Sequence, residues 1–568
     1  MQSKKYDISA NNSNNNIKGD IQSISLECLN NEVISEHKKK SLWQGIKQIY
    51  FEYCSNTSIH GVQYLGEARP WKEKFFWLCV FIVSIYCCSN LIENIYIKWN
   101  ETPVIVSFSE KSTPVWSIPF PAVTICSETK RVLKTEGLNF GEMLEMLKLS
   151  VQDKNAFKPN LNTTEELHEF LTLLHICRTE TIDEGIPRLV TEPIDYFQVL
   201  SRMLPSFERH FFYCKWFSHF GECDELFTPT YTEEGICFTF NGLNSSDLYR
   251  ENTYQYQRAG IEARSSITLN RTLSWSLEDG YNEDSTVRTY PARVLGAGTR
   301  AGLFVALQSF KQEVDYACRG PIQGFKVLLH PPNDVPLVSK QFVRIPMSKE
   351  VSIAVRPNMI TTSSGISEYH PHRRQCFLNS ERHLKFFKIY TQNNCELECL
   401  TNFTYSKCGC VKFSMPRTLD MPVCGEDKIH CYNRAEDDLL FKEFSEGLKN
   451  TDFNYRGETE CNCMPACTSL VYNTEISQAN FDLEDMLKAA GDMDFFEEFP
   501  GSQMTRLAIY FKESQFITSK RSELYGVTDF LANCGGIFGL FMGFSILSMV
   551  EMMYHFSLRL WSNMSRNL

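Results

Sequence analysis

Two long runs without a charged residue divide the chain into three parts. The first occupies residues 75–92 (FFWLCVFIVSIYCCSNLI), and the second occupies residues 530–550 and ends before Glu551. About 20 consecutive apolar residues are enough to cross the hydrocarbon core of a bilayer. We therefore predict two transmembrane helices, one at 75–96 and one within 526–556.

The charges beside the first run indicate its direction. It is preceded by Arg69, Lys72 and Lys74 and followed by Glu93, Lys98 and Glu101. Positive residues collect on the cytoplasmic side of a membrane. We expect a cytoplasmic N-terminus at 1–74, an extracellular region at 97–525 and a cytoplasmic C-terminus at 557–568. The first 20 residues lack the apolar centre of a cleaved signal peptide, so we expect the first span to direct export.

Between the two runs, the pattern alternates between strand-like and helix-like segments. β-Branched stretches such as VIVSF, FPAVTIC, GICFTF, AGLFVAL, GFKVLLH and EVSIAV predict strands. Apolar residues recur at intervals of three and four in FGEMLEMLKL and TEELHEFLTLLHIC, which predicts helices within 140–177. We expect a mixed α+β extracellular region.

Composition narrows the class of protein. The chain has 568 residues, too many for one ordinary core, and a net charge of −11. A nucleic-acid-binding protein needs a basic face to displace counterions from the phosphates, so the acidic balance argues against that class. The Asn-rich first 40 residues contain few apolar residues, and we expect them to be disordered.

Cysteine usage supports an oxidising compartment for the middle region. Sixteen of the 22 cysteines lie between Cys126 and Cys467, an even number suited to disulfides. The same region carries N-glycosylation sequons at Asn100, Asn162, Asn244, Asn270 and Asn402. The other six cysteines, expected to stay reduced, are Cys28, Cys54, Cys79, Cys87, Cys88 and Cys534.

The spacing of four cysteines predicts a ladder of disulfides. Cys395 and Cys399 would lie on one face of a helix about 6 Å apart, and Cys461 and Cys463 on one face of a strand about 6.6 Å apart. An antiparallel helix and strand would pair Cys395 with Cys463 and Cys399 with Cys461, inside an outer pair of Cys376 and Cys467. Within this ladder, we expect Cys408 and Cys410 to pair with Cys424 and Cys431. A zinc cluster is disfavoured, because repeated C-x2-C spacing is absent.

The second apolar run contains small residues and ends in a carboxylate. Gly535, Gly539 and Gly543 have the spacing that lets membrane helices approach closely, so a packing helix is one interpretation. Glu551 favours another, because a carboxylate near hydrocarbon is costly unless it faces water or a partner. Three copies would form an anionic ring, while carbonyls near Gly543 and the Ser545 hydroxyl could replace part of a cation's hydration shell.

Several stretches resemble the degenerin and epithelial sodium channel superfamily, and within it the insect pickpocket-type subunits. In family order over residues 58–551, they are SIHG, FPAVTIC, CKWFSHFGECDELFTPTYTEEGICFTFN, GFKVLLHPPNDVP, YTQNNCELECLTNFTYSKCGCVKFSMPR, CNCMPACTSLVY and NCGGIFGLFMGFSILSMVE. The resemblance implies a trimer whose subunits each have two membrane helices and a large disulfide-rich ectodomain of palm, finger, knuckle, thumb and β-ball. The thumb would occupy about 376–510.

The resemblance also implies roles for single residues. Gly543, Phe544 and Ser545 match the selectivity filter, and Gly539 matches the position associated with amiloride block. Ala532 matches a gating position, as do His60 and Gly61 in a re-entrant segment near 55–66. The family pattern pairs Cys126 with Cys237 and Cys214 with Cys223, which leaves Cys177 and Cys318 as the remaining pair. Arg373 stands where acid-sensing relatives carry tryptophan, which argues against proton gating.

The function implied by this resemblance is that of a pore-forming subunit in the plasma membrane. It would be sodium-permeable, amiloride-sensitive, voltage-independent, gated through the ectodomain and sensory, without a cofactor or resident metal. Its partners would be identical or sibling subunits, lipid and sodium ions. The alternative is a non-conducting accessory subunit or surface receptor. An enzyme is disfavoured, because Leu547 breaks the G-x-S-x-G motif around Ser545.

Overall fold

The computed structural model divides the chain into two compact units. The helical unit comprises Met1–Pro103 and Leu524–Leu568, and the sheet unit comprises Val104–Glu523. The structure describes residues 45–101, 104–131, 138–152, 164–177, 188–190, 193–203, 207–217, 219–258, 272–283, 289–449, 461–491 and 494–562. Asn162, Asn270, Cys28 and most of the expected cytoplasmic N-terminus lie outside these residues.

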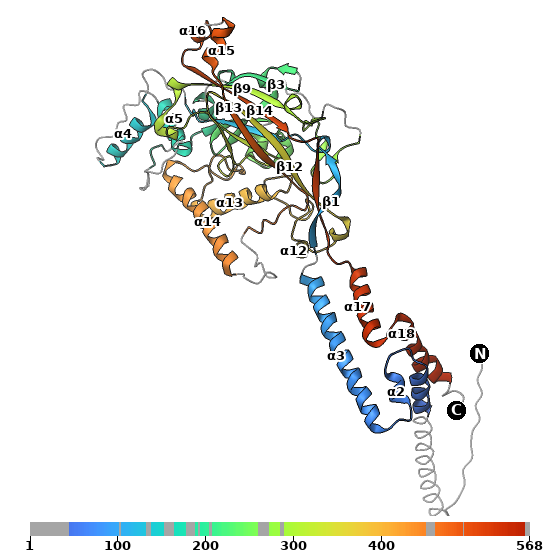
Figure 1. Ribbon diagram of the computed structural model, residues 1–568. Helices are drawn as coiled ribbons and strands as arrows, with labels where there is room; N and C mark the ends of the chain where they lie inside the picture. Colours follow the sequence, from blue (N-terminus) through green and yellow to red (C-terminus); the bar gives the residue numbers. More distant parts are fainter. Residues whose placement is uncertain are drawn as a thin grey trace, which may run out of the picture. The chain divides into compact units, whose positions relative to one another are not determined.

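In the helical unit, helix α3 (Trp71–Glu101) is long and apolar enough to cross a membrane. It extends beyond both ends of the predicted span. The second apolar run is a pair of helices that meets the same criteria together but is bent by 69° at its break. The remaining elements of this unit are helical residues 45–56, α2 (Val62–Gly66), α17 (Val527–Met542), α18 (Ile546–Met553) and the π-helix η6 (Tyr554–Arg559) (Figure 1).

Helices α3 and α17 contact each other. The rings of Trp99 and Phe530 stack with their centroids 5.2 Å apart. Cys88 of α3 and Cys534 of α17 are both buried, although most of α3 is exposed within this single chain. Long exposed apolar surfaces of this kind need lipid or another protein to cover them.

The sheet unit is built on an eight-stranded sheet (Figure 1). The strand order is β1-β15-β12-β14-β9-β3-β4, and β13 pairs with β12. Strand β12 runs parallel to β14 and β15, and the other pairs are antiparallel. The strands are β1 (Val104–Pro114), β3 (Phe211–Trp216), β4 (His219–Gly221), β9 (Leu303–Phe310), β12 (Lys349–Thr362), β13 (Ser469–Asn480), β14 (Ser502–Phe511) and β15 (Gln515–Glu523).

A five-stranded sheet, in the order β11-β10-β2-β6-β5, shares a hydrophobic core with the first sheet. Phe120 is fully buried in this core, and its ring meets Trp216, Phe240 and Phe511 edge to face. The strands are β2 (Ala122–Ser127), β5 (Phe227–Thr232), β6 (Gly235–Phe240), β10 (Phe325–His330) and β11 (Val343–Ile345), and a small separate sheet pairs β7 (Trp275–Ser276) with β8 (Gly280–Tyr281). All six predicted strand segments therefore lie in these two large sheets.

Helices outside the sheets contribute to a second core, which includes Leu171, Phe413 and Tyr432. The two predicted helices are α4 (Phe140–Gln152) and α5 (Thr164–Ile176). The others are α6 (Tyr196–Met203), α7 (Phe207–His210), α8 (Cys223–Leu226), α9 (Ser245–Leu248), α11 (Tyr316–Arg319), α12 (Pro371–Arg374), α13 (Gln392–Cys408), α14 (Ile429–Lys449), α15 (Leu483–Ala490) and α16 (Asp494–Glu498). The 3₁₀ turns are η1 (Val115–Ser117), η2 (Thr299–Ala301), η3 (Lys311–Glu313), η4 (Ser364–Ile366) and η5 (Glu426–Lys428).

All sixteen cysteines between Cys126 and Cys467 are bonded, and the expected pairs are present. Of the two cysteines whose partners were left open, Cys408 bonds to Cys431 and Cys410 to Cys424. The other pairs are Cys126–Cys237, Cys177–Cys318, Cys214–Cys223, Cys376–Cys467, Cys395–Cys463 and Cys399–Cys461. Among the described residues, the free cysteines are Cys54, Cys79, Cys87, Cys88 and Cys534.

One premise of the ladder was wrong. Cys395 and Cys399 lie on helix α13 as predicted, but Cys461 and Cys463 precede β13 and are not in a strand. Asn462 between them has a positive φ of 43°. The Cα atoms of the two pairs are nevertheless 5.7 and 5.5 Å apart, so an irregular segment provides the spacing that the strand was expected to provide.

Candidate functional site

The second apolar run breaks at the three residues expected to form the filter. Helix α17 ends at Gly543, which adopts a left-handed conformation (φ 64°) and donates its N–H to Gly539 at 2.9 Å. Ser545 then caps α18: its hydroxyl accepts the N–H of Ser548, and the Ser548 hydroxyl accepts the N–H of Ser545, both at 3.2 Å. Glycine ends a helix in this way because it has no Cβ to oppose a positive φ.

The segment before α2 contacts this break directly. The His60 N–H donates to the Met542 carbonyl at 2.8 Å, and the hydroxyls of Ser58 and Ser548 are 2.7 Å apart. A Cβ on Gly543 would lie 2.8 Å from the His60 ring and 3.0 Å from the Ser58 carbonyl oxygen. The break therefore depends on a segment almost 500 residues earlier in the sequence.

Gly61 has the conformation that a sharp turn requires. Its φ is 85°, and it is the N-cap of α2. Tyr64 of α2 stacks on Trp77 of α3 with the ring centroids 4.4 Å apart. Gly61 therefore turns the chain into α2, and the ring pair holds α2 against α3.

Helical residues 45–56 contact the C-terminal end of the second run. Glu52 forms an ion pair with Arg559 at 2.8 Å. The Tyr53 ring meets those of His555 and Phe556 at centroid distances of 5.7 and 5.3 Å. These contacts place the segment before the first apolar helix against both parts of the broken run.

Of the other predicted membrane-site residues, Gly539 bonds to the break, since its carbonyl accepts the Gly543 N–H at 2.9 Å. Ala532 and Gly539 on α17 and Glu551 on α18 are exposed within the chain, and no atom lies within 4 Å of a Cβ built on Gly539. Their roles in gating, block and pore electrostatics stay predictions, as does that of Gly543, Phe544 and Ser545 in selectivity.

Sequence reasoning missed Ser58 and Ser548. Ser548 is 1% exposed, which is unusual for a hydroxyl in an apolar run, and its neighbours are the polar groups of Ser545 and Ser58. One signal was available, because two serines three residues apart after a glycine are a helix N-terminal pattern. Ser58 gave no comparable signal.

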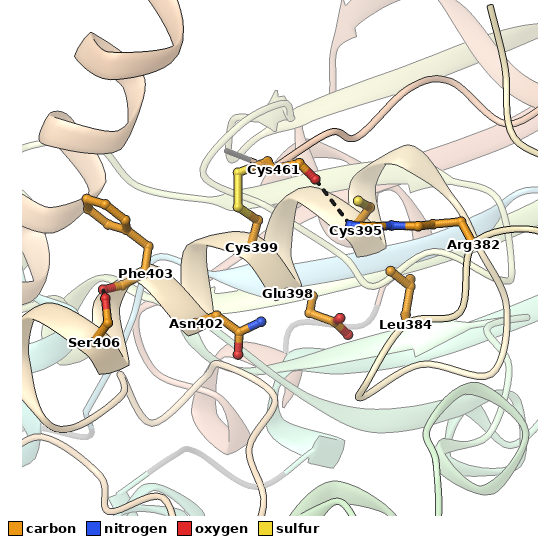
Figure 2. Close-up of a pocket in the computed structure, with 9 residues that line it drawn as sticks. All are labelled: Arg382, Leu384, Cys395, Glu398, Cys399, Asn402, Phe403, Ser406 and Cys461. Atoms are coloured by element: carbon orange, nitrogen blue, oxygen red, sulfur yellow. Dashed lines mark hydrogen bonds between the residues drawn. A yellow bond between two sulfur atoms is a disulfide. The ribbon is translucent and has the colours of Figure 1, made fainter. Parts of the chain in front are cut away.

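A separate cavity of about 240 Å³ opens beside α13 in the sheet unit. It is lined by Arg382, Leu384, Cys395, Glu398, Cys399, Asn402, Phe403, Ser406 and Cys461. Figure 2 shows the Cys399–Cys461 disulfide at its wall and the hydrogen bond of Arg382 to the Cys461 carbonyl, which measures 3.4 Å. The predicted glycosylation residue Asn402 is exposed at this cavity. Asn100 at the end of α3 and Asn244 before α9 are the other predicted glycosylation residues that the structure describes.

Buried histidines in the sheet unit are held neutral. Burial lowers the pKa of His330 to about 4 and that of His175 to about 3. His330 Nδ1 donates to the Pro331 carbonyl at 2.9 Å, so its Nε2 accepts from the Thr124 hydroxyl at 2.9 Å. Burial is the main cause, because it penalises the charged imidazolium.

Glu234 lies at the centre of a buried group of charges. Its carboxylate is 2.7 Å from Lys326 and 3.2 Å from Lys130, and it also pairs with Arg319. Burial, together with the positive charges of Arg319 and Lys326, lowers the pKa of Lys130 well below its ordinary value. Glu234 is therefore a carboxylate shared by three largely buried cations.

Among the described residues, no group of three or more histidine, cysteine, aspartate or glutamate side chains is arranged to hold a metal ion. The break offers hydroxyls and backbone carbonyls, and Glu551 of α18 is exposed within the chain.

Comparison with known proteins gives the family. Residues 53–555 match the amiloride-sensitive sodium channel family. Pickpocket protein 28 of Drosophila melanogaster is 28% identical over 523 residues, covering 90% of this chain and 79% of that protein. Sodium channel protein Nach of the same species is 24% identical over 539 residues, covering 91% and 88%. Human acid-sensing ion channel 2 is 22% identical over 517 residues, covering 88% and 84%.

The family match extends over most of the chain and includes both apolar runs and the sheet unit between them. The protein therefore belongs to the amiloride-sensitive sodium channel family, the degenerin and epithelial sodium channel superfamily with its insect pickpocket-type members, which is a family of ion channels and not of enzymes.

Proposed function

We propose that this protein is a pore-forming subunit of a sodium-permeable, amiloride-sensitive cation channel in the plasma membrane. Helix α3 and the broken pair α17–α18 are its two spans, and both termini are cytoplasmic. Three subunits, identical or sibling, surround one pore. The sheet unit is the extracellular domain through which a sensory stimulus gates the channel.

The observation that carries this proposal is the break at Gly543, Phe544 and Ser545. A helix interrupted at membrane depth leaves backbone groups without helical partners, and this is tolerated where the backbone is buried in protein or lines a water-filled cavity. Ser545 is exposed beside the break, and Glu551 is exposed on α18. Three copies of this arrangement would provide a ring of oxygen atoms with a ring of carboxylates nearby. An anchoring helix requires neither.

Voltage independence follows from the charge distribution. A voltage sensor needs several charged residues within the membrane, typically arginines. Residues 75–92 and 530–550 contain no charged residue. A change in membrane potential therefore has no charged side chain to act upon within these two runs.

The test is whole-cell recording from cells that express the chain alone, with sodium replaced by potassium and with amiloride added. We expect a current whose reversal potential follows the sodium gradient. Ser545→Leu should lower the preference for sodium over potassium, whereas Ser557→Ala, on the nearby π-helix, should not. Unchanged reversal potentials in Ser545→Leu would remove this residue from the filter.

The same recordings separate a pore-forming subunit from an accessory subunit. A non-conducting accessory subunit would reach the cell surface, carry no current alone and alter the current of a co-expressed sibling subunit. Gly539→Ser supplies a further discriminator, because it should weaken amiloride block only if the current passes through this chain.

A further inference from the structure

Three serine hydroxyls join the segment before the first span to the break in the second. Ser58 Oγ is 2.7 Å from Ser548 Oγ, and Ser548 Oγ is 3.1 Å from Ser545 Oγ. The middle serine, Ser548, is buried, while Ser545 is exposed at the break. The connection therefore runs from an early residue to the exposed hydroxyl by way of a hydroxyl with almost no access to water.

The number of donors and acceptors limits how these hydroxyls can be arranged. A serine hydroxyl has one proton and two lone pairs. The Ser548 oxygen uses one lone pair to accept the N–H of Ser545, and the Ser545 oxygen uses one to accept the N–H of Ser548. Ser548 thus has one proton and one lone pair left for its two hydroxyl neighbours.

This limit leaves two arrangements for Ser545. If Ser548 donates its proton to Ser58, its remaining lone pair accepts the Ser545 proton, and Ser545 keeps one free lone pair. If Ser548 donates to Ser545 instead, both lone pairs of Ser545 are occupied, and its proton points elsewhere. A free lone pair attracts a cation, whereas an outward proton repels it. The partner of Ser548 therefore determines what Ser545 presents at the break.

We propose that Ser58 and Ser548 are positioning residues for ion selectivity, in which Ser58 accepts the Ser548 proton and so leaves a Ser545 lone pair free for the permeating cation. The inference rests on the proposed function, since it needs ions to pass Ser545. The His60 N–H bond to Met542 holds the Ser58 segment in place for this purpose. Neither positioning residue has to touch the ion.

The principal test measures sodium and potassium reversal potentials for Ser58→Ala, Ser548→Ala and the double variant. Without Ser58, the Ser548 proton turns to Ser545, and we expect the sodium-to-potassium permeability ratio to fall by about 5-fold, the effect of one net hydrogen bond. The double variant should resemble the single variants, because all remove the same connection. Ser58→Thr keeps the hydroxyl and should keep the ratio.

The matched control is Ser55→Ala, one helical turn earlier, whose hydroxyl bonds only to the Glu52 carbonyl at 2.9 Å. It should leave the permeability ratio unchanged at normal surface abundance. Additive losses in the double variant, or a wild-type ratio in Ser58→Ala, would overturn the inference while leaving a sodium channel intact.

A second measurement does not depend on current. Ser58→Cys combined with Ser548→Cys should form a disulfide when oxidised in intact membranes, and Ser55→Cys with Ser548→Cys should not. Absence of the first crosslink would overturn the proposed contact. A crosslink in a protein that reaches the surface but carries no sodium current would overturn the selectivity role together with the proposed function.

Discussion

Replacing Gly543 by alanine tests whether the break in the second span needs the contact with the early segment. The left-handed backbone at φ 64° costs an alanine about 1–2 kcal/mol. The added Cβ would also lie 2.8 Å from the His60 ring and 3.0 Å from the Ser58 carbonyl. Overpacking of this kind typically costs about 1–3 kcal/mol. The two effects together predict a destabilisation of about 2–5 kcal/mol, concentrated at the break.

The assay compares reversal potential, open probability and surface abundance in Gly543→Ala with those of the wild type. We expect altered selectivity and open probability in the channels that reach the surface, because the early segment has to move away. Gly491→Ala is the matched control: its φ is 73°, and no atom lies within 4 Å of the added Cβ. Gly491→Ala therefore has the free-energy cost of a left-handed backbone but no steric clash with a neighbouring side chain.

A further variant separates the two contributions. His60→Ala combined with Gly543→Ala removes the ring collision but leaves the backbone cost and the Ser58 carbonyl contact. It should recover part of the lost surface abundance. Wild-type selectivity, gating and abundance in Gly543→Ala would refute the reasoning, because the early segment would then place no demand on this position.

Three other predictions concern gating, charge and acid. Ala532→Val should give sustained current, because a bulky side chain at this position is expected to hold the gate open; normal closing in patch recordings would contradict its role. Glu234→Gln should destabilise the protein by about 3–5 kcal/mol in thermal unfolding of the detergent-solubilised channel, since it removes a buried carboxylate that Lys130 and Lys326 both contact; Glu165→Gln, which removes an exposed pair with Arg202, should cost at most about 1 kcal/mol, and equal costs would refute the distinction. Burial lowers the pKa of His330 from 6.5 to about 4, so between these pH values the unfolded chain binds a proton at this residue and the folded chain does not. The stability of the folded state should therefore fall as the pH drops from about 6.5 to about 4, by up to about 3 kcal/mol. His330→Gln should reduce this pH dependence, and an unchanged dependence would assign the acid sensitivity to other groups.

Much of the fold could be predicted from local pattern. Cys395 and Cys399 are four residues apart, so a helix places both side chains on one face, where each can reach a partner cysteine. The strands β2, β9 and β10 were evident from continuous apolar stretches, because both of their faces are largely buried. The irregular segment at Cys461 could not be predicted, since its conformation is set by the disulfides and not by its own residues.

The acidic stretch 482–499 shows how cap residues set the length of a helix. It contains two short helices, α15 and α16, between β13 and β14. Asp482 caps the first by accepting the N–H of Asp485 at 3.2 Å, and Gly491 ends it with a φ of 73°. The two cap residues therefore fix where α15 begins and ends.

The candidate site was predictable only in part. Gly543, Ser545, His60 and Gly61 were identified because they belong to motifs that can be recognised in the chain. Ser58 and Ser548 lie in the same two stretches but were not singled out, because their pairing is set by the fold. Their sequence separation of 490 residues left no local pattern that joins one to the other.

The β1–β15 pair joins the two ends of the sheet unit. Val104 pairs with Glu523, and these are the first and last residues of that unit. Glu101, the last residue of α3, lies three residues before Val104, and Gly526, the N-cap of α17, lies three residues after Glu523. Both chain connections to the helical unit therefore start from one rung of this ladder, so a change that breaks the rung would release the two connections together.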